Sequence, residues 1–308
     1  MRLANSSAMF KILLLALLWG PSFLFIKIAV QEIAPVSIVA LRISLSAVLL
    51  LFVLKMKKIT LPRDPKLWLH CFFMGIFASS LPFILYGYSL ERIDSILSAL
   101  INSTTPVSTL ILANSFLKDE RFTYNRCIGV ALGITGFFIL CLPTLFQNNL
   151  DNPSSDLSGM LLSLAAATCY AIGMVYARKN IKPPKEPLVL PTLQLLTSLV
   201  YLIPLALWID PPLNVFTVSW QTQVSIVGLA ILGTFLAFII YYQIVMKHGA
   251  TAISMVTYIL PLFSIVIGVL FGNETVHINF CIASCFILLG IMVANNVITF
   301  PFWKLRTR

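Results

Sequence analysis

The sequence places an arginine, Arg42, about two turns into an apolar stretch. A guanidinium in that setting costs about 2.5–3.5 kcal/mol on insertion scales and requires a partner or water. Its partner could be a substrate carboxylate, backbone carbonyl groups or Glu32, and the alternative is a structural anchor that snorkels outward. Lys27 lies nearer the end of its own apolar stretch, and snorkelling accounts for that position.

Polar side chains recur at spacings of three and four through residues 94–116, which places them on one face of a helix. A polar face avoids lipid and turns inward, where it can line a wet cavity that contacts a substrate. The alternative is helix–helix packing, because small and hydroxyl side chains let two backbones approach. A later stretch, 250–272, carries a counterpart with Ser254 and Tyr258. The stripe itself comprises Ser95, Ser98, Asn102, Thr105 and Thr109.

Aromatic side chains supply area and cation–π contacts that suit amphipathic or cationic solutes. Core packing and an interfacial belt are the alternatives. Gln194 could present an amide in the same layer as Arg42. The predicted substrate cavity comprises Trp19, Phe23, Arg42, Tyr86, Ser98, Asn102, Thr105, Tyr170, Gln194, Tyr241, Ser254 and Tyr258.

Prolines interrupt the apolar stretches at matching places. Pro106 and Pro261 each remove a backbone donor and free the carbonyl four residues earlier. Paired interruptions can mark a hinge or a binding site, and the alternative is a static kink. Gly20 beside Pro21 is a third predicted weak point.

No catalytic constellation is apparent. The six cysteines and three histidines have no ligand-like spacing, so we expect no metal site, no cofactor and no disulfide framework. The carboxylates are scattered, which argues against a membrane enzyme. No P-loop is present, which excludes direct ATP drive by this chain, and no filter motif indicates a channel. A receptor or scaffold would carry a sizeable soluble segment, and the sequence has none.

Composition identifies the elements that must position these residues. Hydrophobic residues make up 59% of the 308 and charged residues 10%, against roughly 25% charged in a soluble domain. The net charge is +10, and the lysine and arginine residues lie mainly between apolar segments. This distribution indicates the loops of a membrane protein and not nucleic-acid binding. We predict an all-α integral membrane protein whose ten transmembrane helices lie in a lipid bilayer, near 9–30, 36–54, 67–89, 94–116, 124–145, 158–178, 188–208, 222–246, 250–272 and 278–299.

Alternate loops carry most of the lysine and arginine, including Lys55, Lys57 and Lys58, whereas Arg92 lies in the opposite set. The positive-inside rule then predicts that both termini are cytoplasmic, in a plasma membrane and by expectation a bacterial inner membrane. Residues 148–157 are expected to form an extracytoplasmic linker, and 300–308 a basic cytoplasmic tail.

The two halves of the chain resemble each other. Pro35–Arg42 matches Pro187–Gln194 at an offset of 152, and Tyr86–Pro106 matches Tyr241–Pro261 at 155. We therefore predict a duplicated unit, 1–147 and 158–299, with five helices in each copy. Because five is odd, the second copy enters the membrane inverted, as in many secondary transporters.

The sequence resembles the drug/metabolite transporter superfamily, in its EamA-type ten-helix branch. The resemblance rests on Trp19-Gly20-Pro21-Ser22-Phe23 with Lys27, on Pro35 with Arg42, and on patterns that end in Pro106 with Glu120 and Pro261 with Glu274. Tyr170 departs from the tryptophan that the family often has at the start of the second repeat. In the resemblance, Glu120 and Glu274 close equivalent motifs, and we expect both at the inner edge in a structural or gating role.

The resemblance implies secondary transport of a small metabolite, commonly an amino acid or related compound and often outward. The alternative is uptake or exchange of a specific metabolite such as S-adenosylmethionine or a nucleotide-like solute. Transport could be coupled to a proton or to a counter-substrate. No carboxylate lies clearly within a predicted span, which weakens the case for proton coupling. Ten spans can enclose a cavity in one chain, so both a monomer and a homodimer stay open.

Overall fold

The computed structural model describes residues 6–117, 123–146, 156–182, 184, 186–209, 217–248, 250–295 and 297–298. Every regular element in these residues is helical. In lipid a helix satisfies its own backbone groups, which explains this choice for so apolar a chain. The predicted linker, apart from Asp156 and Leu157, and the predicted tail lie outside the described residues.

The described part of the first half contains eight α-helices and one π-helical segment, η1, which joins α4 to α5. The bounds are α1 (Ser6–Trp19), α2 (Ser22–Ala29), α3 (Pro35–Met56), α4 (Pro65–Gly75), η1 (Ile76–Ser80), α5 (Leu81–Leu90), α6 (Ser95–Asn102), α7 (Thr105–Phe116) and α8 (Tyr124–Phe146). In the second half they are α9 (Leu157–Asn180), α10 (Val189–Ile209), α11 (Trp220–Ala230), η2 (Ile231–Leu236), α12 (Ala237–His248), α13 (Ala250–Gly272) and α14 (Ile278–Ala294).

Among the described residues, eight helical stretches are long and apolar enough to cross a membrane, and each lies at a predicted span. They run over Met9–Ala29, Pro35–Met56, Pro65–Leu90, Ser95–Phe116, Tyr124–Pro143, Leu157–Asn180, Val189–Ile209 and Trp220–Val245. The apolar parts described at the last two predicted spans are shorter, at Ile259–Gly272 and Ile278–Ala294.

Two of the predicted weak points interrupt helices. The Gly20–Pro21 pair separates α1 from α2, and residues 103–104 separate α6 from α7 just before Pro106. The break leaves the carbonyl of Asn102 free for the hydroxyl of Thr105, at 2.7 Å. The predicted break at Pro261 is wrong, because α13 continues through this proline as one helix. A proline can be tolerated as a kink where neighbouring groups satisfy the freed carbonyl.

Both halves widen into a π-helix at matching positions. The segment η1 begins at Ile76 and η2 at Ile231, 155 residues later, which is the offset of the Tyr86–Pro106 match. Such segments alter hydrogen bonding within a helix and are frequent at functional sites. The equivalence supports the predicted duplication by a feature that hydropathy does not report.

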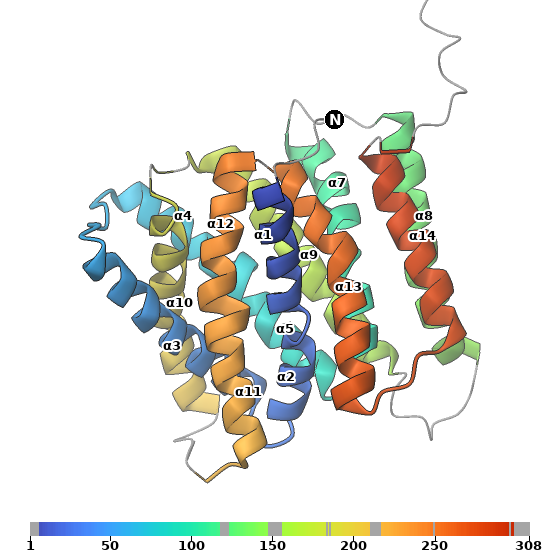
Figure 1. Cartoon of the computed structure of the whole chain (residues 1–308), viewed down its shortest axis with the longest axis horizontal. Helices are drawn as coiled ribbons and strands as arrows, with labels where there is room; N and C mark the ends of the chain where they lie inside the picture. Colours follow the sequence, from blue (N-terminus) through green and yellow to red (C-terminus); the bar gives the residue numbers. More distant parts are fainter. Residues whose placement is uncertain are drawn as a thin grey trace, which may run out of the picture.

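The helices form a bundle in which α8 and α14 lie side by side at one edge (Figure 1). These two helices approach closely, since a Cβ on Gly129 would stand 2.4 Å from the carbonyl oxygen of Gly290. The start of α1 and helix α7 lie at one end of the bundle, whereas α2 and the loop after α13 lie at the other (Figure 1). We call this second end the α2 end.

Candidate functional site

Arg42 lies at the junction of the two halves. Its Nε donates to the hydroxyl of Thr234 at 2.6 Å, and its Nη2 donates to the carbonyl of Gly233 at 3.1 Å. The guanidinium stacks 3.8 Å from the ring centroid of Phe83, and the residue is 3% exposed. No ion pair to Arg42 is present among the described residues. Of the partners considered, the backbone carbonyl is therefore the one observed, and snorkelling is excluded in this conformation.

The predicted partner Glu32 contacts another group. Its carboxylate accepts from the backbone N–H of Ser219 at 2.8 Å, in front of α11. Hydrogen bonding to the Ser219 side chain and backbone lowers the pKa of Glu32. Glu32 therefore stays ionised in front of α11, and the charge of Arg42 has no carboxylate partner among the described residues.

The second half repeats this arrangement without the charge. Gln194 on α10 donates from Nε2 to the hydroxyl of Ser79 in η1 at 2.6 Å, and it accepts from the Tyr242 hydroxyl at 2.8 Å. Gln194 follows Arg42 by 152 residues, and Thr234 follows Ser79 by 155. Each half therefore directs a polar side chain of its second span to a hydroxyl in the π-helix of the other half.

Aromatic rings gather beside Arg42. Phe23 meets Tyr86 edge to face at 5.2 Å, and Tyr86 lies 6.1 Å from Tyr170 between ring centroids. The hydroxyl of Tyr86 donates to Oδ1 of Asn102 at 2.6 Å. Tyr86 is 2% exposed and Phe23 7%, so core packing and cavity lining remain for them and the interfacial belt is excluded. A gap too narrow for a water molecule adjoins Arg42 and Phe83, so the centre is closed in this conformation.

Trp19 joins the same junction from the end of α1. Its indole N–H donates to the carbonyl of Gly233 at 3.2 Å, and its ring lies 5.8 Å from that of Tyr241. The carbonyl of Gly233 thus accepts from two side chains of the first half, Trp19 and Arg42.

Ser98 lies in a closed cluster of hydroxyl groups. Its Oγ is 2.7 Å from that of Ser163 on α9, which is itself 2.7 Å from that of Ser89 on α5. All three side chains are fully buried, and Ser89 also donates to the carbonyl of Gly159 at 2.7 Å. For Ser98 the structure supports the helix-packing alternative over the cavity. Small hydroxyl residues allow α5, α6 and α9 to approach.

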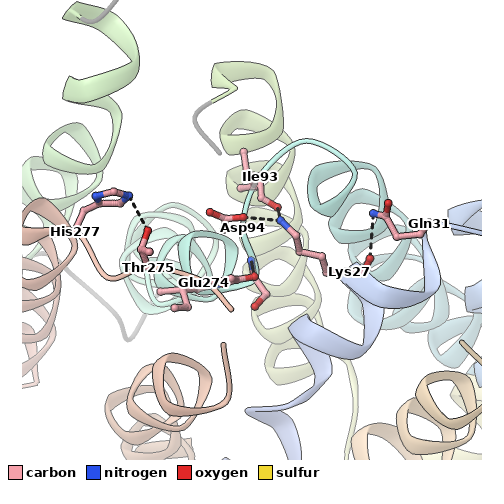
Figure 2. Close-up of polar contacts among 9 residues, drawn as sticks. Lys27, Gln31, Ile93, Asp94, Glu274, Thr275 and His277 are labelled. Atoms are coloured by element: carbon pink, nitrogen blue, oxygen red, sulfur yellow. Dashed lines mark hydrogen bonds and ion pairs between the residues drawn. The ribbon is translucent and has the colours of Figure 1, made fainter. Parts of the chain in front are cut away.

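A polar network closes the α2 end of the bundle (Figure 2). Lys27 pairs with Asp94 at 2.6 Å and donates to the carbonyl of Ile93 at 2.9 Å. The carboxylate of Glu274, which follows α13, accepts from the backbone N–H groups of Ser95 and Ile96 at 2.8 and 2.9 Å. Lys27 therefore has a specific partner in addition to its place near the surface.

The predicted inner-edge position of Glu274 is wrong under the predicted orientation. Glu274 contacts the start of the Ser95–Phe116 stretch, whereas Glu120 would follow its far end. The predicted odd number of spans in each half would bring matching motifs to opposite ends of the bundle. Glu274 caps a helix of the first half, consistent with the expected structural or gating role. Glu120 lies outside the described residues, as do the side chains of Ser254 and Tyr258.

Several residues at the junction were not singled out from the sequence: Ser22, Ser79, Phe83, Gly233 and Thr234. Ser79 and Thr234 carry a usable signal, since both are hydroxyl residues at the repeat offset of 155. The sequence gives no such signal for Gly233, because this residue contributes a backbone carbonyl.

The chain matches the EamA-like transporter family over residues 6–142 and again over 157–296. An uncharacterized transporter of Archaeoglobus fulgidus is 24% identical over 278 residues, 89% of this chain and 94% of that protein. A probable amino-acid metabolite efflux pump of Salmonella typhimurium is 23% identical, with 86% and 87% covered. One crystal structure superposes with a TM-score of 0.67 at 20% identity, over 96% of this chain and 99% of that chain. That likeness shows the fold.

The double match spans both halves, and the apolar helices are long enough to cross a bilayer repeatedly. The chain is a multi-pass membrane protein and belongs to the EamA-like transporter family.

Proposed function

We propose that this protein is a secondary transporter that moves an amino acid or a related small metabolite outward across the plasma membrane. The observation that carries the proposal is the buried guanidinium of Arg42, which holds hydroxyl and carbonyl groups of the other half and no carboxylate among the described residues. A buried charge without a counter-ion favours an anionic or zwitterionic partner. Relatives named as probable amino-acid metabolite efflux pumps support the substrate class and the direction.

Alternating access is the proposed mechanism, with two inverted five-helix repeats that rock against each other. The matched pairs Arg42–Thr234 and Gln194–Ser79 support it, because each joins one half to the π-helix of the other. The breaks at Gly20–Pro21 and residues 103–104 supply bending points beside the junction.

We further propose that the α2 end is the extracytoplasmic gate and that both termini are cytoplasmic. In this conformation, Glu274 of the second half holds the start of α6 in the first half. Lys27 holds the same turn through Asp94 and the Ile93 carbonyl. Export requires these contacts to separate in the outward-open state and to re-form afterwards. One chain contains both halves of the junction, so a monomer suffices.

Uptake or exchange of a metabolite such as S-adenosylmethionine or a nucleotide-like solute is the second candidate. The rings of Phe23, Tyr86 and Tyr170 favour it, since they could stack on a base. Exchange against a counter-substrate is favoured over proton antiport, because the described part of the junction contains no carboxylate beside Arg42.

The test is flux through proteoliposomes with the purified protein. Labelled amino acids, polyamines, nucleosides and S-adenosylmethionine are offered with and without a pH gradient and with counter-loaded solute. We expect saturable flux of an amino-acid-like solute, and dependence on the gradient or the counter-solute separates the two modes of coupling. Flux of none of these solutes through folded protein would contradict the proposal.

Two variants test whether flux depends on the polar residues at the junction. Arg42→Ala and Asn102→Ala should impair flux at unchanged membrane abundance, since one removes the charge and the other the partner of Tyr86. Ser163→Ala is the matched control, because it removes a buried hydroxyl that serves packing at α5 and α6. Unchanged flux in the first two variants would refute the assignment of the site.

A further inference from the structure

Hydrogen-bond donors of the first half converge on one carbonyl of the second. Gly233 accepts from the indole N–H of Trp19 at 3.2 Å and from Nη2 of Arg42 at 3.1 Å. The hydroxyl of Ser22 lies beside them: a Cβ built on Gly233 would stand 2.7 Å from Ser22 Oγ and 3.3 Å from Arg42 Nη2. Ser22 is 8% exposed, and its Oγ has no hydrogen-bond partner among the described residues.

The donors at this point exceed the acceptors that the described residues offer. A carbonyl oxygen has two lone pairs, and Trp19 and Arg42 use both. Ser22 keeps an unused donor. A buried polar group without a partner is destabilising, and the charge of Arg42 is not neutralised. An ionised carboxylate, with two oxygens and about four lone-pair sites, matches this set of donors.

We propose that Trp19, Ser22 and Arg42 form the subsite for a substrate carboxylate, and that the Gly233 carbonyl occupies it when no substrate is bound. This inference rests on the proposed transport function and narrows its substrate class to solutes that carry a carboxylate. The amide of the same solute offers one neutral oxygen and the decarboxylated amine offers none, so we expect both to be rejected.

When a substrate carboxylate replaces the Gly233 carbonyl as the acceptor of these hydrogen bonds, substrate binding is coupled to movement of the two halves. The three donors belong to α1, α2 and α3 of the first half, whereas Gly233 belongs to η2 of the second. A carboxylate that takes the donors from Gly233 therefore breaks two hydrogen bonds between the halves. An empty carrier stays closed at this junction because the carbonyl holds the donors. A Cβ at 233 would stand 2.7 Å from Ser22 Oγ and 3.3 Å from Arg42 Nη2, so these donors would have to shift.

The experiment measures charge at the subsite without transport. The six native cysteines are replaced, and Ser22→Cys is introduced into the full-length protein in liposomes. The thiol is reacted with the anionic sulfonatoethyl and the cationic trimethylammonium-ethyl methanethiosulfonates, and each rate is divided by the rate with free 2-mercaptoethanol. We expect the anionic reagent to be favoured, and Arg42→Gln to shift the ratio about tenfold or more toward the cationic one. An unshifted ratio, or no reaction with either reagent, overturns the subsite.

Acetate and acetamide are the second probes. Acetate should slow the labelling of Ser22→Cys, whereas equal concentrations of acetamide or sodium chloride should not, and Arg42→Gln should abolish the protection. If Ser22→Cys does not fold, thermal unfolding of the wild-type protein and of Arg42→Gln in the same three solutes replaces it. Equal effects of acetate, acetamide and chloride overturn the proposal. Charge-selective labelling without flux would refute transport alone, and flux without charge selectivity would refute the subsite alone.

Discussion

Glu274→Gln is the most direct test of the proposal that the α2 end is a gate. The carboxylate joins the loop after α13 to the first turn of α6 through two hydrogen bonds, at 2.8 and 2.9 Å, and the residue is 9% exposed. The backbone around it is tightly fitted: a Cβ on Gly268 would stand 2.5 Å from Cγ1 of Ile96. Glutamine keeps the shape of the side chain and one acceptor oxygen, so the change removes charge and one bond with little repacking.

The size of the effect follows from these contacts. A hydrogen bond to a charged group contributes about 1.5–3 kcal/mol, and an anion at a helix N-terminus about 0.3–1 kcal/mol. Losing one bond and the charge should cost the closed conformation about 2 kcal/mol. Since about 1.4 kcal/mol is a factor of ten, the ratio of closed to open molecules should fall about 30-fold.

The assay is labelling of Leu97→Cys, in the cysteine-free protein, by a membrane-impermeant maleimide. Leu97 lies in α6 one residue beyond the contact with Glu274 and is 1% exposed, so its labelling requires opening. We expect labelling about 30-fold faster with Glu274→Gln. Asp64→Asn is the control, since Asp64 is an exposed cap of α4 that accepts from the backbone N–H of Lys66 in its own half, and this change should leave the rate unchanged. Reduced thermal stability with unchanged labelling would refute the gate and leave Glu274 a structural cap.

Three further predictions concern packing and pH. Gly233→Ala should abolish flux, whereas Gly228→Ala, whose Cβ would meet only the ring of Phe25 at 2.8 Å, should retain most of it when both are compared in proteoliposomes. Ser163→Ala should lower the free energy of unfolding by about 1–3 kcal/mol and leave flux per folded molecule unchanged, as denaturation and uptake assays would show. Burial acts to raise the pKa of Asp156, but hydrogen bonds from Ser158 and Gly159 and the charge of Arg92 together outweigh it and lower the pKa. The stability from this cap is therefore present above about pH 4 and lost as pH falls further, so Asp156→Asn should flatten the acid side of the stability profile.

The architecture could be predicted because a bilayer leaves few choices. Apolar length specified the eight long helical stretches, and Gly20–Pro21 and Pro106 lie at the two breaks. Arg42 stood out for the same reason, since a charge in an apolar segment needs an explanation from any fold.

The hydrogen-bond partners of the polar residues could not be predicted from the sequence. Ser98 and Asn102 share one helical face, yet Ser98 bonds to Ser163 in a packed cluster and Asn102 bonds to Tyr86 beside Arg42. Periodicity gives the face of a helix but not the neighbour that covers it. Pro261 matches Pro106 in sequence and not in effect, because a break depends on how neighbouring groups satisfy the freed carbonyl.

The matched junctions differ in one respect that bears on mechanism. Arg42–Thr234 and Gln194–Ser79 occupy equivalent places, but only the first carries charge. A neutral amide already satisfied by Ser79 and Tyr242 has little to gain from an anion, whereas Arg42 gains a counter-ion. Of these two junctions, the one at Arg42 therefore carries the charge that an anion could neutralise. The Gln194 junction is then a cross-half contact that can stay closed while the Arg42 junction opens, and Gln194→Ala should weaken stability more than substrate selectivity.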